Sequence, residues 1–420
     1  MLINWKSRIP GVRKLFDGSV WRGGFLPVPL VSLALLFFFV HPCPAPDFKV
    51  PSFPNFFKGR GNETLQEVGR APTGPGGLCQ LPNGDYIISC HQFFGHQYRV
   101  MRKSRDGWEP FPNLEMNTPG KGHPVELDSV LGVVNNGNVV WMLDNGRRSG
   151  KQPKLVAWDT KKDCLHRIIL LNPSVRETSI LKNLVLDPNY PFIYISDPAD
   201  GVESAIIVVN LDTGLSRRVL DGHTSVRSDP AVSIILDGKT VEARRADGKL
   251  AKPLSGVSPF ALDRKGEWLY YGPRNSTTLH RIKTELLRLP NLPPSTLNAN
   301  VKGFCPKPVC DSIAIDSKDR IYFSDIGNSA VTYVTPDDDY LEIHPLVMDP
   351  RMVWPGGLLF GTDGQLHFFC NQLNRAPIFN GGRNQTSSPY YLFKIRPLPT
   401  KRFKRLPDFP TKLPQPLKNQ

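Results

Sequence analysis

The sequence is poor in cysteine, and its few cysteines lack the spacing of common metal modules. None of the seven forms a zinc-finger pair with partner histidines, and the nine histidines show no metal-binding spacing. None of His91, His96, His223 and His344 shows a local pairing with a serine or cysteine nucleophile, and a catalytic triad formed in space stays open. Cys305 and Cys310 could form a disulfide in an oxidising compartment. Buried free thiols are the equal alternative for Cys79, Cys90 and Cys370.

The sequence also lacks a strongly basic middle region, which argues against nucleic acid as a partner. Its formal net charge is +14, but residues 1–60 and 396–420 each contribute +6. The middle of the chain therefore carries only +2, too little for a broad phosphate-binding face.

Long apolar runs are absent apart from residues 25–40, FLPVPLVSLALLFFFV. Five basic residues between Lys6 and Arg22 precede this run, which places the N-terminus in the cytoplasm and the rest beyond the membrane. Sixteen residues span about 24 Å as a helix, short of the ~30 Å bilayer core, so the run suits a secretory signal as well as an anchor. We predict a basic cytoplasmic segment at 1–24 and a signal peptide or signal anchor at 25–40. The protein would be secreted, or a single-pass type II membrane protein facing the lumen or the exterior.

Three N-x-S/T sequons agree with this compartment. They begin at Asn62, Asn275 and Asn384, each in a loop-like stretch beyond the apolar run. The pattern predicts N-glycosylation at these three residues.

Long helical patterns are missing too, and a two-strand repeat takes their place. In residues 310–328, CDSIAIDSKDRIYFSDIGN, two apolar runs flank a polar turn, which is a hairpin signal. Similar hairpins begin at residues 75, 129, 181, 256, 310 and 355. Self-similarity at a period of roughly 40–50 residues indicates a repeat fold, because one unit cannot bury its own apolar face. We predict an all-β fold, a six-bladed β-propeller at 64–396 with four strands a blade around a central channel.

The ends of the propeller are predicted to close on each other. The last strand, 389–395, should complete a blade begun by 64–70, which removes an exposed sheet edge. A Pro/Phe-rich linker at 41–63 precedes the propeller, and a basic, Pro-rich tail at 397–420 follows it.

Two insertions interrupt the repeat, at 222–255 and 282–309. The first contains a polar hairpin, and the second a short helical turn and a Pro-rich loop. Such insertions should lie on one rim, where they could cover the channel.

Several separated motifs resemble the yellow/major royal jelly protein family. In chain order they are PKLVAWDTKK at 153–162, FIYISD at 192–197, IIVVNLDTGLSRRVLDGHTSV at 206–226 and WPGGLLFG at 354–361. The resemblance runs from about Pro72 to Pro397 and implies a six-bladed propeller of a mostly secreted family. In that family some members are proposed to rearrange oxidised catechols, and others bind biogenic amines in the channel. A more distant likeness connects the chain to gluconolactonase-type propellers, which hold a divalent metal on the channel axis.

One residue near the start of each inner strand should point toward the channel. Aligning the hairpins places Gly76, Ser129, Lys182, Ser258, Asp311 and Gly356 there. A hard cation needs several oxygen ligands, whereas only one of these residues is acidic and Lys182 would repel the ion. We therefore expect no cofactor, with a divalent metal as the disfavoured alternative.

Lys182 and Asp311 are the candidate catalytic residues. An amine and a carboxylate facing one channel could act as general acid and base on a polarised ring. They could instead hold a charged ligand, with Asp311 pairing an ammonium, or pair with each other. If the channel is functional, Asp311→Ala should abolish binding or turnover and leave the melting temperature nearly unchanged. The candidate ligand-binding residues are Ser129, Asn183, Ser258, Trp354 and Asn371.

Two of the remaining assignments have structural alternatives. Trp354 could stack on an aromatic ligand or pack between blades. Asp144, Asp197 and Asp325 each end a second strand, where a carboxylate is expected to accept backbone N–H bonds of the following turn.

Two classes of function stay open. The first is a metal-independent isomerase or tautomerase acting on a small aromatic or oxidised metabolite. The second is a non-catalytic binder of a small ligand such as an amine. A lactonase-like hydrolase, and a scaffold that uses the propeller rims for protein contacts, are further alternatives. We expect no nucleic-acid partner, and contact with a membrane only through the N-terminal segment.

Overall fold

The computed structural model describes residues 65–398, except 121, 122, 124, 245–247, 337–340 and 388. The predicted cytoplasmic segment, the apolar run and the linker lie outside the described residues, as does the tail from residue 399 onward. Within the described part, no helix combines the length and the apolar character needed to cross a membrane.

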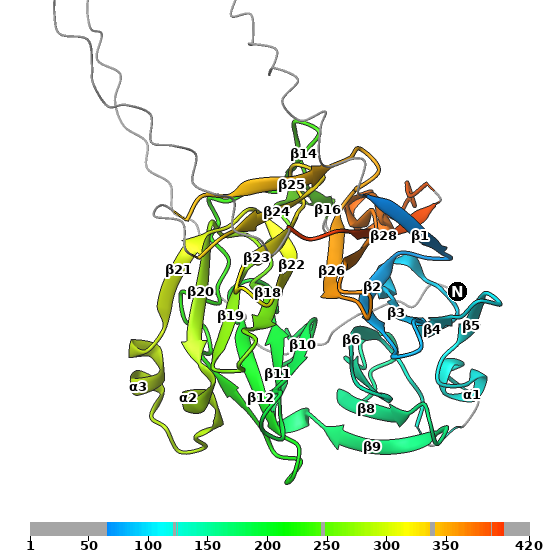
Figure 1. Cartoon of the computed structure of the whole chain (residues 1–420), viewed down its shortest axis with the longest axis horizontal. Coiled ribbons are helices and arrows are strands. Elements are labelled where there is room, and N and C mark those ends of the chain that lie inside the picture. Colours follow the sequence, from blue (N-terminus) through cyan, green and yellow to red (C-terminus); the bar gives the residue numbers. More distant parts are fainter. Residues whose placement is uncertain are drawn as a thin grey trace, which may run out of the picture. The chain divides into compact units, whose positions relative to one another are not determined.

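Six four-stranded antiparallel sheets form a ring, as the hairpin repeat predicts (Figure 1). Within each sheet the strands are given from the innermost to the outermost. The first sheet consists of β2 (Pro75–Gln80), β3 (Tyr86–Cys90), β4 (Val100–Lys103) and β5 (Trp108–Pro110), and the second of β6 (Val130–Asn136), β7 (Val139–Asp144), β8 (Lys154–Asp159) and β9 (Cys164–Leu170). The third consists of β10 (Leu184–Leu186), β11 (Phe192–Asp197), β12 (Ala205–Asn210) and β13 (Ser216–Val219).

The other three sheets complete the ring. They are β18 (Val257–Leu262), β19 (Trp268–Pro273), β20 (Thr278–Lys283) and β21 (Lys302–Pro306); β22 (Cys310–Ile315), β23 (Ile321–Asp325), β24 (Ala330–Val334) and β25 (His344–Met348); and β26 (Pro355–Phe360), β27 (Leu366–Cys370), β28 (Tyr390–Ile395) and β1 (Gln66–Ala71). The predicted closure is confirmed, because β1 from the start of the propeller pairs antiparallel with β28 from its end.

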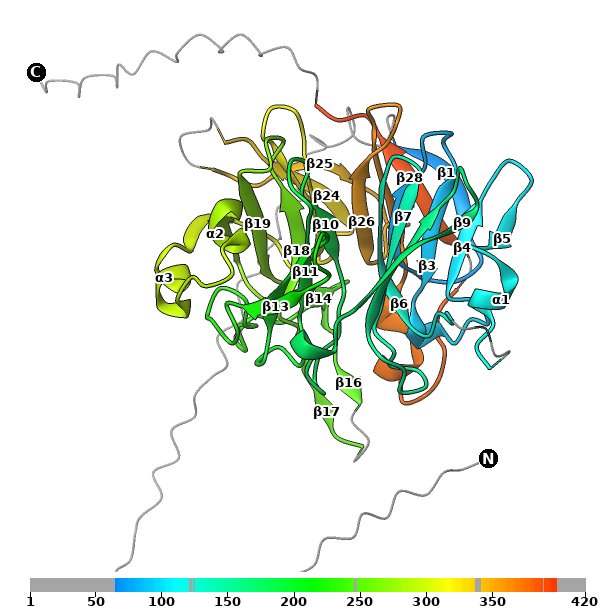
Figure 2. The same ribbon diagram turned by 90° about the horizontal axis from the view of Figure 1, so that it is seen from below.

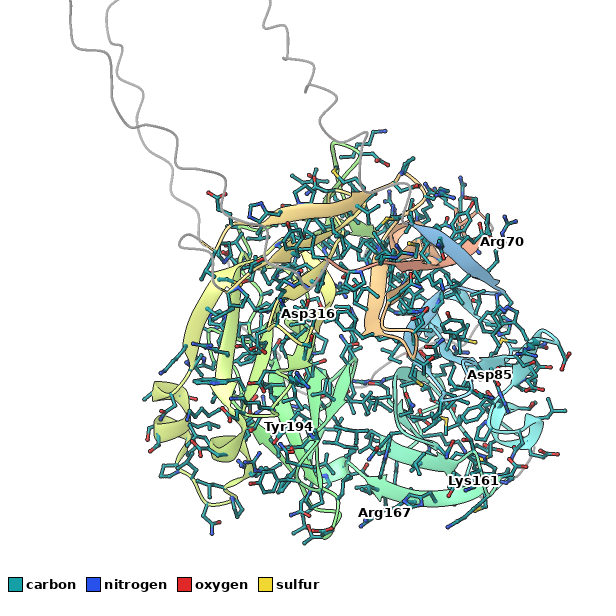
Figure 3. The ribbon with its side chains drawn as sticks, in the orientation of Figure 1. Arg70, Asp85, Lys161, Arg167, Tyr194 and Asp316 are labelled. Atoms are coloured by element: carbon teal, nitrogen blue, oxygen red, sulfur yellow. The ribbon has the colours of Figure 1, made fainter. Side chains whose placement is uncertain are left out.

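The inner strands β2, β6, β10, β18, β22 and β26 each contact the next around the ring and enclose the channel (Figure 1). Alternating apolar residues bury both faces of each sheet against its neighbours. Among the described residues, six apolar clusters result, one between each pair of adjacent blades. Figure 3 shows these side chains between the sheets, with Arg167 and Lys161 on the outer edge of the ring.

The connections hold short helices and two small hairpins. The helices are α1 (Leu114–Asn117), α2 (Thr284–Arg288) and α3 (Pro294–Ala299), with 3₁₀ turns η1 (Gln92–Phe94), η2 (Asn172–Ser174), η3 (Leu373–Arg375) and η4 (Pro377–Phe379). The insertion after β13 forms the hairpins β14 (Ile235–Leu236) with β15 (Lys239–Thr240), and β16 (Ala243–Arg244) with β17 (Leu250–Ala251). Figure 2 shows β16 and β17 projecting from one rim of the ring.

Candidate functional site

Five of the six inner strands begin with a β-bulge, and the bulges place the candidate residues. The register against the second strand shifts near the start of β2, β6, β18, β22 and β26. A bulge bends its strand and re-aims the side chains within it. Ser258 and Asp311 lie inside two such shifts, and Lys182 lies two residues before the sixth inner strand, β10. The three side chains thereby meet at one end of the channel.

Asp311 is the centre of this group: its carboxylate accepts hydrogen bonds from three side chains and forms an ion pair with a fourth. Lys182 Nζ lies 2.5 Å from Oδ1 in an ion pair, although the ammonium makes no well-directed hydrogen bond. Oδ1 also accepts from Arg274 Nε and, at 3.0 Å, from Ser258 Oγ. Oδ2 accepts from Trp354 Nε1 at 2.8 Å. We call these five residues the charged cluster; it pairs two cations with one carboxylate.

Burial and charge set the protonation of the cluster. Burial alone would raise the pKa of Asp311, but the charges of Arg274 and Lys182 outweigh it and hold that pKa well below its usual range. Burial, followed by the charge of Arg274, lowers the pKa of Lys182 to about 8. Lys182 and Asp311, which were predicted to act as acid and base, therefore form one ion pair. The sequence alone did not distinguish this pairing from a catalytic role.

Two further buried bases border the cluster and were not among the predicted residues. Burial, and then the charge of Lys182, lower the pKa of His91 to about 3, so the imidazole stays neutral near neutral pH. Its Nδ1 accepts from the backbone N–H of Phe93. Lys307 is 2% exposed and donates to the carbonyls of Arg274 and Ser276, which fixes the loop that carries Arg274.

Asn183 separates the charged cluster from an open cavity. Its Nδ2 donates to Ser258 O at 2.6 Å and to Asp311 O at 3.0 Å, so this amide connects three blades across the channel. Beyond it lies a cavity of about 380 Å³, lined by residues of all six inner strands. We call this space the channel cavity. Asn183 is part of its lining, whereas the charged cluster is not.

The opposite end of the cluster is covered by loops and by the first insertion. Ile234 and Leu236 of the β14–β15 hairpin pack with Ile326, Leu373 and the fully buried Trp354, among others. The expectation that this insertion covers the channel is confirmed for that hairpin. Trp354 packs beneath it with its indole N–H bound to Asp311, so it is a buried packing residue and does not line the channel cavity.

Two predicted ligand-binding residues have structural partners instead. Ser129 Oγ accepts from the backbone N–H of Arg147. Asn371 Nδ2 donates to Pro75 O, and its Oδ1 accepts from Leu373 N. Neither residue belongs to the lining of the channel cavity.

The turn-capping role of the strand-ending aspartates is confirmed. Asp144 accepts from the backbone N–H groups of Asp128, Ser129 and Gly146. Asp197 and Asp325 likewise accept backbone N–H groups in the loops near them.

The surroundings of Asn275 in the fold argue against its predicted glycosylation. This residue is fully buried, its Nδ2 donates to Val232 O, and its Oδ1 accepts from Ser255 N. These bonds tie down both ends of the insertion, and no room is left for a glycan. Asn384 is exposed, and Asn62 lies outside the described residues.

The possible disulfide between Cys305 and Cys310 does not form in the structure. Both are buried thiols, and burial raises the pKa of Cys305 to about 12 and that of Cys310 to about 11. In the described ranges, no three His, Cys, Asp or Glu side chains gather where they could hold a metal.

Arg274 was not among the predicted residues, because those come from the start of each inner strand. It occupies a second ring of positions, directly after the second strand of a blade, where His91, Asn145 and Asn371 are its counterparts. Four polar residues at equivalent positions of six repeats were a signal present in the sequence. Lys307 directly follows the outer strand β21, and no comparable pattern in the sequence predicted its contact with Arg274.

Comparison with known proteins gives a family and several distant folds. No curated protein matches the sequence significantly. Among solved structures, virginiamycin B lyase from Staphylococcus aureus is 15% identical with a TM-score of 0.44, covering 80% of this chain and 99% of that one. A gluconolactonase from Xanthomonas campestris is 13% identical with a TM-score of 0.49, covering 80% and 91%. The PQQ-bound aldose sugar dehydrogenase from Streptomyces coelicolor is 13% identical with a TM-score of 0.49, covering 79% and 97%.

These three likenesses say nothing about what this chain binds. The family is shown by a match in sequence: the model of the major royal jelly protein family matches residues 130–386, more than half of the 420-residue chain. The match takes in the charged cluster, Asn183 and the covering hairpin. The chain belongs to the major royal jelly protein family.

Proposed function

We propose that the protein binds a small, uncharged and partly apolar molecule, of the aromatic or oxidised kind, in its channel cavity. The observation that carries this proposal is the cavity of about 380 Å³ lined by the inner strands of all six blades. Its size lies within the range of small-molecule sites in proteins, about 300–1,000 Å³.

The lining suits a flat molecule with a few polar atoms. Apolar side chains such as Val133, Leu184, Phe260 and Ile313 contribute to the wall. Each inner strand is also the edge of its sheet, so its backbone N–H and C=O groups on the channel side have no strand partner. A ligand could therefore be held by apolar contact and by hydrogen bonds to backbone groups.

The charges at the closed end oppose two of the alternatives. Two cations surround the one carboxylate, so neither an amine nor a divalent metal gains a free anionic partner there. Asp311 already accepts from three donors, pairs with the Lys182 ammonium, and is a poor base because its pKa is held low. We therefore favour binding over lactone hydrolysis or amine capture.

A metal-independent isomerase is the second candidate, and the pKa of Lys182 near 8 favours it. An amine with that pKa could protonate an oxidised ring near neutral pH. The substrate would have to reach Lys182 past Asn183 or past the covering hairpin. Turnover of an oxidised catechol by the wild-type protein, lost in Lys182→Met, would support this candidate over simple binding.

We also propose that the propeller faces the lumen or the exterior, on the basis of the apolar run at 25–40 and its basic flank. Protease protection of the full-length chain in sealed microsomes tests this. Digestion of the propeller without detergent would contradict it.

A pair of neighbouring substitutions tests the binding site. Asn135 lies in β6 and lines the cavity, whereas the exposed next residue, Asn136, does not. Asn135→Trp places a large ring at a lining position and should obstruct the cavity, whereas Asn136→Trp lies outside the lining and should leave it open. We expect saturable binding of small aromatic alcohols, measured by titration calorimetry, to be lost only in Asn135→Trp. Equal binding by both variants would overturn the proposal.

A further inference from the structure

The inner end of the channel cavity presents a fixed hydrogen-bond acceptor, Asn183 Oδ1. The backbone N–H of Asn183 donates to Ser196 Oγ at 3.0 Å, and its Nδ2 donates to carbonyls of two other blades. Those carbonyls fix the orientation of the amide, because a flipped amide would place its oxygen against two other oxygens. Oδ1 makes no hydrogen bond to any described residue, and the partly exposed side chain lines the cavity.

We infer that Asn183 makes the channel cavity select ligands that carry an uncharged hydroxyl, such as alcohols or phenols. This inference rests on the proposed function and adds the chemical class of the ligand. A hydroxyl donates one hydrogen bond to Asn183 Oδ1, while the rest of the molecule contacts the apolar wall. An ether or a ketone of the same size has no proton to donate and leaves Oδ1 without a partner.

Charge distinguishes a hydroxyl from an ammonium at this position. An ammonium also donates hydrogen bonds, but directly behind Asn183 the cluster holds two cations and only one carboxylate. Asp311 is occupied by both cations, by Ser258 and by Trp354, so it offers no free oxygen to a third cation. An amine would moreover lose its hydration on entering a partly apolar cavity without gaining a counter-ion.

A carboxylate fits no better, although the cluster is positively charged. It carries acceptors only, and the exposed atom of Asn183 is itself an acceptor. The cations lie behind the amide and outside the lining of the cavity, so a carboxylate could not contact them from there.

The effect of one such hydrogen bond is modest and measurable. A neutral hydrogen bond contributes a factor of roughly two to ten in affinity. The acceptor is already held in place by its partners, so little ordering of the protein is required on binding.

Three ligands of nearly equal size test the inference on the wild-type, full-length protein. Benzyl alcohol donates without charge, benzyl methyl ether does not donate, and benzylamine donates as a cation. We expect titration calorimetry to give benzyl alcohol the highest affinity, the ether roughly two- to tenfold less, and the amine the least. An ether that binds as tightly as the alcohol would overturn the inference while leaving the proposed function intact. An amine that binds as tightly would overturn the inference and also contradict the uncharged ligand of the proposed function. Failure of all three to bind would overturn both.

A variant pair assigns the preference to the amide. Asn183→Ala should bring the affinity for the alcohol down to that for the ether, whereas Asn136→Ala, at an exposed asparagine outside the lining, should keep the difference. Circular dichroism and a melting curve check that each variant is folded. The wild-type ligand series decides the matter if Asn183→Ala does not fold. A folded Asn183→Ala that still prefers the alcohol would contradict the assignment.

Discussion

Replacing Asp311 with alanine is expected to destabilise the propeller strongly. The carboxylate is the counter-charge of both Lys182 and Arg274, and all three residues are more than nine-tenths buried. The variant would leave two buried cations without an anion and Trp354 Nε1 without an acceptor. Breaking a buried ion pair by removing one partner costs about 3–5 kcal/mol. For a domain of this size that loss lowers the melting temperature by about 4–7 °C.

This expectation reverses the one drawn from sequence, in which Asp311→Ala left the melting temperature nearly unchanged. The reason is that Asp311 is a buried counter-ion with three hydrogen-bond donors and an ion-paired ammonium, whereas the sequence suggested a residue exposed to the channel. Urea unfolding followed by far-ultraviolet circular dichroism would measure the free energy of unfolding. Asp212→Ala, at an exposed turn, is the matched control and should change it by less than about 0.5 kcal/mol.

A substitution of Lys182 instead of Asp311 gives a second test of the charged cluster. Lys182→Met removes the surplus cation and leaves Arg274 and Asp311 as a balanced pair, so we expect a loss of no more than about 1 kcal/mol. If Asp311→Ala is as stable as the wild type, or if Lys182→Met is the more damaging variant, the account of the charged cluster is refuted.

Two other predictions concern acid stability and glycosylation. The pKa of His91 is about 3 in the folded chain and near 6.5 in the unfolded chain. Between these pH values the unfolded chain binds more protons, so the free energy of unfolding falls as the pH falls, by up to about 1.4 kcal/mol per pH unit. His91→Asn keeps an acceptor for Phe93 N and should reduce this pH dependence of stability, measured by urea titrations at pH 4–6.5. The control His166→Asn, at an exposed position, should not reduce it. Equal slopes in the two variants would contradict the burial argument. When the chain is expressed through a eukaryotic secretory pathway, glycopeptide mass spectrometry should find a glycan on the exposed Asn384 and none on the buried Asn275. A glycan on Asn275 of folded protein would show that the insertion is not held as described.

Much of the fold could be predicted because each blade repeats the same local signal. An inner hairpin such as Cys310–Ile315 with Ile321–Asp325 shows the alternation and the polar turn in consecutive residues. Six copies of that signal gave the number of blades. The closing pair of β1 and β28 followed because the chain had one strand left over at each end.

The site was harder to predict, because its geometry depends on bulges and on distant loops. The alignment brought Lys182, Ser258 and Asp311 together correctly, but their pairing depends on Arg274, which comes from the end of another strand. The burial of Trp354 under the β14–β15 hairpin depends on how a polar insertion folds back, which no periodic pattern reports. The buried state of Asn275 has the same cause.

The central claim is that the channel cavity holds a small uncharged molecule, and native mass spectrometry of the protein purified from its own source tests this most directly. The account predicts a mass excess equal to one small hydroxyl-bearing molecule per chain, retained in Asn136→Trp and absent in Asn135→Trp. A wild-type chain that carries no such molecule and shows no uptake of benzyl alcohol would contradict it.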